Sequence, residues 1–231
     1  MQSFPGGFQA LIIGSSGSIG SAFLDLLRLH PDCAKVIGLH RHSQPAINFE
    51  NEESIGQAAS NLSKQGPFHL IINAAGILHT PHFTPEKKLS NLNYAQIEKT
   101  FRVNAFGPAL ILNYFSKLLH PAKGVMVMLS AKVGSIEDNR LGGWYSYRAS
   151  KAALNMFLKT AAIELQRIQP NTTVIALHPG TVNSNLSKPF RGEQIGRAPV
   201  EAVREMWQVI EGLQPQDTGK FYSYNGQVLP W

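Results

Sequence analysis

Tyr147 and Lys151 have the spacing at which a lysine can tune the acidity of a tyrosine. Residues i and i+4 share one face of a helix, so a phenol and an ammonium group come close together there. A nearby ammonium favours the phenolate, and we expect it to lower the tyrosine pKa from its ordinary value of about 10. Tyr145 has only Ala149 at the same offset. Tyr147 is therefore the candidate general acid and base.

A glycine-rich segment near the start of the chain is suited to hold phosphate groups. Its pattern, Gly-x-x-x-Gly-x-Gly, lies between a short apolar run at residues 8–13 and an amphipathic run at residues 19–29. Glycine allows a tight turn close to a pyrophosphate, and the following helix offers free N–H groups and the positive end of its dipole. The expected dinucleotide-binding residues are Gly14, Ser15, Ser16, Gly17, Ser18, Ile19 and Gly20.

The residues after the second expected strand indicate which dinucleotide binds. In folds that prefer NAD, an acidic residue about 20 positions after the glycines hydrogen-bonds the ribose 2′-hydroxyl. Here the strand ends in Gly-Leu-His-Arg-His over residues 38–42, without an acidic side chain. Arg41 is instead suited to form paired hydrogen bonds with a 2′-phosphate. We therefore expect NADP(H) to be preferred over NAD(H).

Two further segments are expected to contact the adenosine end of this cofactor. The first has small side chains at the end of an apolar run, where ligands of parallel sheets bind. It consists of Asn73, Ala74, Ala75 and Gly76. The second, Asn48 and Phe49, ends another expected strand and is a candidate for flanking the adenine.

The elements that carry these residues follow from the pattern of apolar side chains. Short apolar runs predict seven strands, at residues 8–13, 36–39, 47–49, 68–73, 125–130, 173–177 and 220–224. Helical spacing predicts helices at residues 19–29, 52–64, 94–119, 146–168 and 199–213. Strands that are apolar on both faces and alternate with helices indicate a mostly parallel sheet. We therefore predict one α/β domain over residues 1–231, a doubly wound, Rossmann-type fold whose seven-stranded sheet has helices on both faces.

The order of these motifs resembles that of the short-chain dehydrogenase/reductase family across nearly the whole chain. The resemblance rests on the glycine pattern, the Asn-Ala-Ala-Gly segment at residues 73–76, Asn104, Ser130, Tyr147 with Lys151, and Pro179-Gly180. Residues 134–155 look most similar to the C-factor and sniffer-type carbonyl reductase branch. The resemblance implies hydride transfer between nicotinamide C4 and a carbonyl or secondary alcohol, and NADPH use favours reduction.

The resemblance also implies a catalytic tetrad of Asn104, Ser130, Tyr147 and Lys151 facing the nicotinamide. A serine hydroxyl would join Tyr147 in stabilising the charge that develops on the substrate oxygen. Lys151 would tune Tyr147 and hold the nicotinamide ribose, and Asn104 would hold a water that resupplies the proton. Asn104 is also compatible with a simple helix kink, because Gly107 and Pro108 follow it.

The serine departs from the family pattern. Ser130 lies farther before Tyr147 than the family serine does, and it is one residue too far from Gly134. Ala131 occupies the usual serine position relative to that glycine, and an insertion at residues 136–143 accounts only for the first difference. Ser130 is the expected donor, with Ser135 as its rival. If neither faces the substrate, we expect Tyr147 to act with less help and turnover to be slower.

The segment after the sixth expected strand resembles the one that contacts the nicotinamide carboxamide in this family. It consists of Pro179, Gly180, Thr181 and Val182. Residues 183–197, rich in glycine, proline and polar side chains, are expected to form a mobile lid over the substrate. Candidates for lining the substrate pocket, each also compatible with packing or a surface position, are His79, His82, Leu141 and Trp144.

Composition narrows the remaining classes of partner. No apolar run approaches the roughly 20 residues of a membrane-spanning helix. Cys33 is the single cysteine, so an intrachain disulfide and a cysteine-rich metal site are excluded, and no metal is expected. The net charge of +6 comes from scattered lysines and arginines, which argues against nucleic acid. We expect a cytoplasmic protein with a small carbonyl or alcohol substrate. The two long helices resemble those that pair subunits in this family, which implies a homodimer or homotetramer.

Two other functions remain open at this point. The C-factor resemblance suggests a cofactor-binding signalling or sensor protein with little turnover. An isomerase or dehydratase on the same fold is also conceivable, because a fold does not fix a function. The intact pair of Tyr147 and Lys151 favours an oxidoreductase over both.

Overall fold

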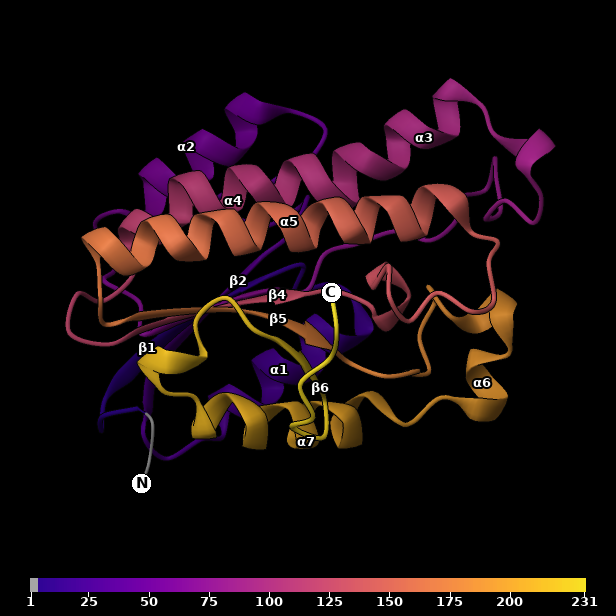
Figure 1. The fold of residues 1–231 in the computed structure, drawn as a ribbon. Helices are drawn as coiled ribbons and strands as arrows, with labels where there is room; N and C mark the ends of the chain where they lie inside the picture. The colour runs from indigo at the N-terminus through magenta and orange to yellow at the C-terminus, as the bar shows by residue number, and fades with distance from the viewer. Residues whose placement is uncertain (1–3) are drawn as a thin grey trace.

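Six parallel strands form the sheet that organises residues 4–231, the part of the chain that this computed structural model describes (Figure 1). The strands are β1 (Phe8–Ile13), β2 (Cys33–Leu39), β3 (Leu70–Asn73), β4 (Gly124–Leu129), β5 (Thr172–His178) and β6 (Phe221–Ser223). Their order in the sheet is β2-β1-β3-β4-β5-β6. The direction of winding therefore reverses between β1 and β3, and the crevice outside their carboxyl ends is where ligands bind in such sheets.

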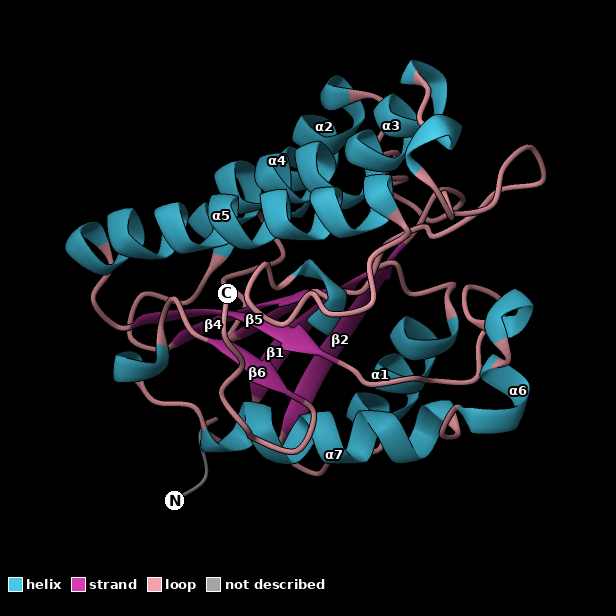
Figure 2. Ribbon diagram, turned by 45° about the vertical axis from the view of Figure 1, so that its right-hand side comes forward, coloured by secondary structure: helices cyan, strands magenta, loops and turns pink. Residues whose placement is uncertain are grey.

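Helices cover both faces of this sheet (Figures 1 and 2). One face carries α2 (Glu52–Leu62), α4 (Gly107–Phe115) and α5 (Tyr145–Ile168), and the other carries α1 (Ser18–Arg28) and α7 (Pro199–Gly212). The remaining helices are α3 (Tyr94–Phe101) and the single turn α6 (Gly192–Ile195). No helix among residues 4–231 is both long enough and apolar enough to cross a bilayer.

Alternating side chains of the strands build two separate cores. In β1, Leu11 and Ile13 pack with the helices α2, α4 and α5, whereas Ala10 and Ile12 pack with α1 and α7. All four side chains are fully buried. Full burial of a leucine or isoleucine contributes about 1.5–3 kcal/mol, so a strand buried on both faces anchors the sheet between its helix layers. The predicted two-sided α/β architecture is confirmed.

The predicted seventh strand is wrong, and the sheet is entirely parallel rather than mostly parallel. Residues 47–49 are irregular in the described chain, and the Ile47 N–H donates to the His40 carbonyl (3.1 Å) without a strand ladder. Pro45 lacks a donor at the start of this segment. Three residues after Asn48, the Asn51 side chain already caps α2 by accepting from the Ser54 N–H (3.3 Å). Too little chain remains between these two points for a strand.

The long helix predicted at residues 94–119 is divided. α3 passes into a π-helical turn, Arg102–Phe106, and then into α4 and a final 3₁₀ turn, Ser116–Leu118. Single π turns within helices often occur at functional sites. Asn104 lies in this turn, so the helix is irregular at this residue.

Candidate active site

The glycine segment forms a tight cradle between β1 and α1. Gly14 has a φ of +83°, which side chains other than glycine rarely adopt, and a Cβ atom on Gly20 would lie 2.2 Å from the Gly14 carbonyl oxygen. Neither position accepts a larger residue without moving the backbone. The helix leaves the first N–H groups of α1, at Ser18, Ile19 and Gly20, without an i−4 partner. This cradle has the donors and the space that a pyrophosphate requires.

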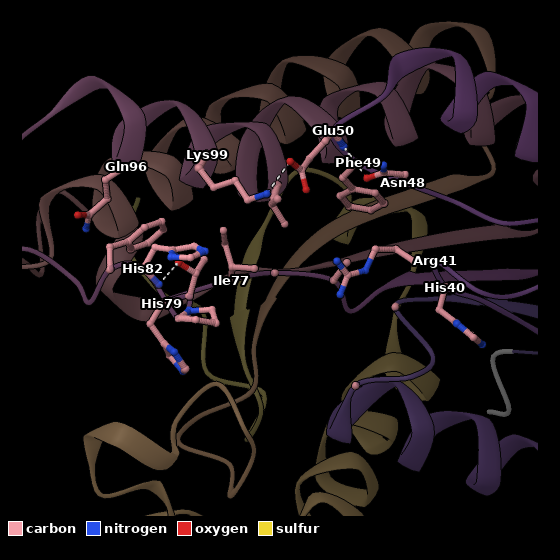
Figure 3. A pocket seen from close by; sticks show the side chains of 18 of the residues that line it. His40, Arg41, Asn48, Phe49, Glu50, Ile77, His79, His82, Gln96 and Lys99 are labelled. Atoms are coloured by element: carbon pink, nitrogen blue, oxygen red, sulfur yellow. Dashed lines mark hydrogen bonds and ion pairs between the residues drawn. The ribbon is translucent and has the colours of Figure 1, made fainter.

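A cavity of about 900 Å³ opens beside the cradle, at the carboxyl edge of β1 and β3. Figure 3 shows Arg41, Asn48 and Phe49 at one end of it and His79, His82 and Gln96 at the other. The predicted cofactor residues that line it are Gly14, Ser16, Gly17, Arg41, Asn48, Phe49, Ala74, Ala75 and Gly76. The cavity thus brings together predicted residues from three parts of the chain, near residues 14–17, 41–49 and 74–76.

Arg41 is exposed and makes no hydrogen bond or ion pair with any residue of the described chain. An unpartnered guanidinium at a cavity wall is free to bind an anionic group. Phe49, at the same end, rests on Gly107: a Cβ atom on that glycine would lie 2.6 Å from Cδ2 of the ring. Gly107, which the sequence marks only as a possible kink, therefore makes room for the aromatic wall of the cavity.

Two predicted cofactor residues use their side chains for hydrogen bonds that hold the loops after β1 and β3. The Ser15 hydroxyl donates to the Leu39 carbonyl (3.2 Å), and Asn73 Oδ1 accepts from the Ala75 N–H (3.2 Å). These bonds fix the loops after β1 and β3. The two loops also touch, because a Cβ atom on Gly14 would lie 2.7 Å from the Ala75 nitrogen.

Tyr147 and Lys151 lie in the first turns of α5 and are almost fully buried, with exposed fractions of 9% and 4%. The Lys151 ammonium donates to the Leu129 carbonyl (2.9 Å) and lies 6.0 Å from the centre of the Tyr147 ring. The Tyr147 hydroxyl has no hydrogen-bond partner among residues 4–231. The expected geometry, with both side chains on one helix face, is present.

Burial, rather than the neighbouring ammonium, dominates the acidity of both groups. It raises the pKa of Tyr147 to about 12 and lowers the pKa of Lys151 to about 8. The expected decrease in the tyrosine pKa is therefore wrong for the chain alone. Desolvation destabilises the Tyr147 phenolate by more than the charge of Lys151 stabilises it, because burial also disfavours the charged form of the lysine.

Asn104 ties the π turn to the loop after β3. Its side-chain amide donates to the Ile77 carbonyl (2.8 Å) and to the Ser150 hydroxyl (3.2 Å), and its Oδ1 accepts from the Ile77 N–H (2.8 Å). A Cβ atom on Gly76 would lie 3.4 Å from Asn104 Oδ1 and 3.6 Å from Lys151 Nζ. Gly76, Asn104 and Lys151 therefore meet at one point. Both amide hydrogens are already used, so they are not available to hold a water.

The hydroxyls of the two candidate serines bind groups other than Tyr147. The Ser130 hydroxyl donates to Asn155 Oδ1 (2.6 Å), eight residues or about 12 Å farther along α5 than Tyr147. The Ser135 hydroxyl donates to the Trp231 carbonyl (3.0 Å) and accepts from the Asp138 N–H (3.1 Å). Ala131 instead packs against Tyr147. The position that borders the tyrosine thus carries a methyl group.

Apolar side chains enclose Tyr147. Leu78 and Ala131 pack against it in a buried cluster, together with the partly buried Val133, Trp144, Leu186 and Phe190. Leu186 and Phe190 belong to the segment predicted as a lid, which therefore lies over the tyrosine. Among the proposed pocket residues, Trp144 contacts Tyr147 edge to face (6.1 Å between ring centres), whereas Leu141 is 91% exposed. His79 and His82 line the large cavity instead.

Arg197, which sequence analysis did not single out, holds the segment after β5. Its Nη2 donates to the Pro179 carbonyl (2.5 Å), its guanidinium stacks 3.6 Å above the Tyr224 ring, and it forms an ion pair with Glu205. A Cβ atom on Gly180 would lie 2.6 Å from Arg197 Nη2. Arg197, the last residue of the predicted lid, thus holds the predicted nicotinamide segment, Pro179 to Val182. This segment does not line the large cavity.

Glu86 is a second residue that sequence analysis missed. It is 2% exposed and binds the N-terminal end of α5. Both missed residues act through contacts with distant parts of the chain, and no local pattern marks such contacts. No group of three or more histidine, cysteine, aspartate or glutamate side chains in the described chain is arranged to hold a metal ion.

Comparisons with known proteins agree with this geometry. The profile of the short chain dehydrogenase family matches residues 9–195. Among curated relatives, the C-signal of Myxococcus xanthus is 35% identical over 167 residues, covering 72% of this chain and 94% of that protein. The 1-hydroxy-2-glutathionyl-2-methyl-3-butene dehydrogenase of Rhodococcus sp. (strain AD45) is 31% identical over 189 residues, covering 81% and 80%.

Solved structures share the fold. The carbonyl reductase Sniffer of D. melanogaster superimposes with a TM-score of 0.83 at 20% identity, covering 97% of this chain and 99% of that one. An NADPH-bound carbonyl reductase from chicken fatty liver gives a TM-score of 0.82 at 23% identity, covering 96% and 94%. At these identities, the likeness establishes the architecture and not the substrate.

Proposed function

The chain belongs to the short-chain dehydrogenase family of oxidoreductases, and we propose that it uses NADP(H) to reduce a carbonyl group or to oxidise the corresponding secondary alcohol. The observation that carries the proposal is the meeting of Gly76, Asn104 and Lys151 beside Tyr147, at the edge where the glycine cradle opens. A dinucleotide site and a buried proton donor are thus joined through one loop.

The residues present fit a nicotinamide dinucleotide. The cradle at Gly14 and Gly20 has no room for side chains, and an open cavity adjoins it. The first turn of α1 and the loop at residues 73–76 would hold the pyrophosphate and adenosine, with Asn48 and Phe49 beside the adenine. Tyr147, Lys151 and residues 179–182 would hold the nicotinamide half. The cofactor, when bound, supplies or accepts the hydride.

A preference for NADP(H) is supported by Arg41. This exposed arginine has no partner in the described chain, and it lies at the cavity wall where a 2′-phosphate would extend. The strand before it ends without the acidic residue that favours NAD. The related fold from chicken is described as NADPH-bound, which is consistent with this assignment.

The protonation state of Tyr147 favours the direction of reduction. With a pKa of about 12, the phenol keeps its proton at neutral pH and can donate it to the oxygen of an accepting carbonyl. Lys151, whose pKa of about 8 leaves it mostly charged at neutral pH, stabilises the phenolate that remains. Alcohol oxidation needs the phenolate first, so we expect it to require higher pH.

We propose that Tyr147 is the main side-chain donor to the substrate oxygen, because Ala131 borders it where a serine is usual and the Ser130 hydroxyl is bound to Asn155. The apolar cluster around Tyr147 supports an uncharged carbonyl substrate with an apolar or aromatic substituent. A charged group would lose its hydration there without compensation.

We also infer that copies of the chain pair through α4 and α5, as a homodimer or homotetramer. Met156, Phe157 and Ile163 on α5 are exposed although they are large and apolar. Apolar side chains that gather on one exposed surface mark interaction sites. The molar mass in solution, measured for the wild type and for Phe157→Glu, tests this assembly.

A cofactor-binding signalling protein with little turnover is the second candidate. It is supported by the similarity to C-signal and by the alanine at the usual serine position. The deciding experiment titrates NADPH and NADH by fluorescence and then follows NADPH oxidation against a panel of aldehydes and ketones. Turnover supports the reductase, tight NADPH binding without turnover supports the signalling role, and no dinucleotide binding contradicts both.

A further inference from the structure

Glu86 is a buried carboxylate that no positive charge neutralises. It lies in the loop between β3 and α3, its exposed fraction is 2%, and it takes part in none of the ion pairs formed by residues 4–231. Unpaired buried carboxylates are rare, because removing the charge from water is costly. Hydrogen bonds must therefore compensate this one.

These hydrogen bonds all come from the N-terminal end of α5. The Ser146 N–H donates to Glu86 Oε2 (3.1 Å), and the Ser146 hydroxyl donates to Oε1 in a short contact. The main chain joins in, since the Trp144 N–H donates to the Glu86 carbonyl oxygen (2.6 Å). Both oxygens of the Glu86 side chain thus have a hydrogen-bond partner at the start of the helix. The positive end of the helix dipole adds to its stabilisation.

Glu86 also replaces a cap that the helix lacks. The residue before α5, Trp144, has a left-handed backbone with a φ of +51° and makes no side-chain capping bond. The N–H groups of the first helical turn need partners. Glu86 supplies one from 60 residues earlier in the chain.

The position of Tyr147 depends on this turn. Trp144 and Ser146, the two residues that Glu86 binds, come shortly before Tyr147, and its hydroxyl has no hydrogen bond of its own in the described chain. Its place is therefore set by the backbone of the turn and by apolar packing against Leu78 and Ala131. Lys151, one turn later, is held separately by the Leu129 carbonyl.

We propose that Glu86 is a positioning residue, which holds the first turn of α5 so that the Tyr147 side chain stays largely buried with its hydroxyl at the substrate position. The proposal rests on the proposed reductase function for its kinetic consequence, but the burial of Tyr147 can be measured without turnover. A misplacement of about 1 Å can lower a rate about a hundredfold.

The experiment compares Glu86→Gln and Ser146→Ala with Asp217→Asn. Asp217 is the control: its carboxylate also accepts from a backbone N–H, that of Gln214 (2.8 Å), and from a hydroxyl, that of Tyr222 (2.8 Å), although unlike Glu86 it is ion-paired, with Lys220 (2.7 Å). Asp217 precedes β6 and so lies at the amino ends of the strands, whereas Tyr147 lies beyond their carboxyl ends. All three variants lose contacts of a capping carboxylate. Ser146→Ala keeps the Glu86 side chain and the backbone contact, so it remains informative if Glu86→Gln does not fold.

Two readouts separate positioning from general stability. The first is kcat with saturating NADPH, together with the Kd for NADPH. The second is the alkaline absorbance titration of each protein minus that of its Tyr147→Phe counterpart, which reports ionisation of Tyr147 alone. The charged group facing Tyr147 is Lys151, and its other neighbours are apolar, so loss of burial will lower the Tyr147 pKa from about 12 toward its ordinary value.

For Glu86→Gln we expect kcat to fall about tenfold or more, with an unchanged Kd for NADPH and earlier ionisation of Tyr147. Ser146→Ala will change in the same direction by less, and Asp217→Asn will lower only the melting temperature. If Glu86→Gln and Ser146→Ala keep the wild-type ionisation of Tyr147, the proposal is wrong, even if both are less stable. If the wild type has no turnover, the reductase function fails, while the titration still decides the role of Glu86.

Discussion

The nucleotide end and the chemical end of the site are built in opposite ways. The nucleotide end is an open cavity of about 900 Å³, and the part of it beside the glycine cradle is lined by glycines, alanines and an arginine without a partner in the described chain. At the chemical end, Asn104, Tyr147 and Lys151 are all buried, and apolar side chains of the lid lie over the tyrosine. The first is preformed for a ligand, whereas the second is closed.

Cofactor binding and proton transfer therefore depend on different groups in this protein. At the nucleotide end, most donors are backbone N–H groups that no side-chain substitution removes, so affinity depends on the shape of the glycine cradle and on Arg41. At the chemical end, desolvation shifts the pKa values of the reacting side chains. Variants at the nucleotide end should therefore change mainly the Kd for the cofactor, and variants at the chemical end mainly kcat.

The largest effect is expected for Tyr147→Phe. Removing the proton donor should lower kcat about a thousandfold, because general acid catalysis contributes about 10²–10⁴-fold. The Kd for NADPH should change little, because only one hydroxyl at the nicotinamide half is lost, while the glycine cradle and Arg41 are intact. Tyr145→Phe is the control, because it removes a hydroxyl two residues earlier in the same helix and should keep wild-type turnover. A large rise in the Kd for NADPH in Tyr147→Phe would mean that the two ends are not separate.

Arg41→Asp should produce the converse result. Hydrogen bonds to charged groups contribute about 1.5–3 kcal/mol, so the affinity for NADPH should fall about tenfold to a hundredfold. The affinity for NADH, which lacks the 2′-phosphate, should change little. Fluorescence titration of both cofactors measures this, with Arg140→Asp as a control for net charge outside the cavity. Equal losses for NADPH and NADH would contradict the role of Arg41.

The sequence predicts the nucleotide end better than the chemical end. Residues 8–13 match β1, and the glycine pattern lies between β1 and α1 as expected, because local backbone requirements fix both. At the chemical end, the roles of Ser130 and Ala131 depend on which of two adjacent side chains points toward α5. Adjacent residues near the end of a strand point in opposite directions. An offset of one residue relative to the family pattern therefore exchanges the two side chains.

Long-range contacts explain the remaining differences. Glu86 and Ser146 are 60 residues apart, so no local pattern in the sequence links them. The segment Ile47-Asn48-Phe49 has two residue types that are common in strands, but only the paired neighbour decides whether a strand forms. Burial of the Tyr147 side chain likewise raises its pKa where the sequence predicts a decrease, and burial depends on the whole packed cluster.

Ala131→Ser tests the chemical end by an expected gain of activity. A hydroxyl at this position would add a second donor next to Tyr147, and a single such donor contributes about 10²–10³-fold in optimised sites. We expect kcat/KM for a ketone to rise about tenfold, since the surrounding site is not arranged for it. Ser130→Ala, the matched variant, should lose stability with its Asn155 contact but keep its turnover. The reverse pattern would restore Ser130 as the catalytic serine.

The smallest effect concerns the free energy of unfolding, which the buried charge of Lys151 lowers. The pKa of Lys151 is about 8 when folded and 10.5 when unfolded, so below about pH 8 the folded state bears the full cost of a buried charge. Between these values the unfolded state binds more protons, and stability rises with pH as the cost disappears. The shift destabilises the folded state by at most about 3 kcal/mol at pH 7, and the hydrogen bond to Leu129 returns about 1–2 kcal/mol of stability.

Lys151→Met should therefore be about 1 kcal/mol more stable than the wild type at pH 7, although inactive. Urea unfolding at several pH values should show this advantage shrinking above about pH 8, and an advantage independent of pH would assign the effect to packing alone.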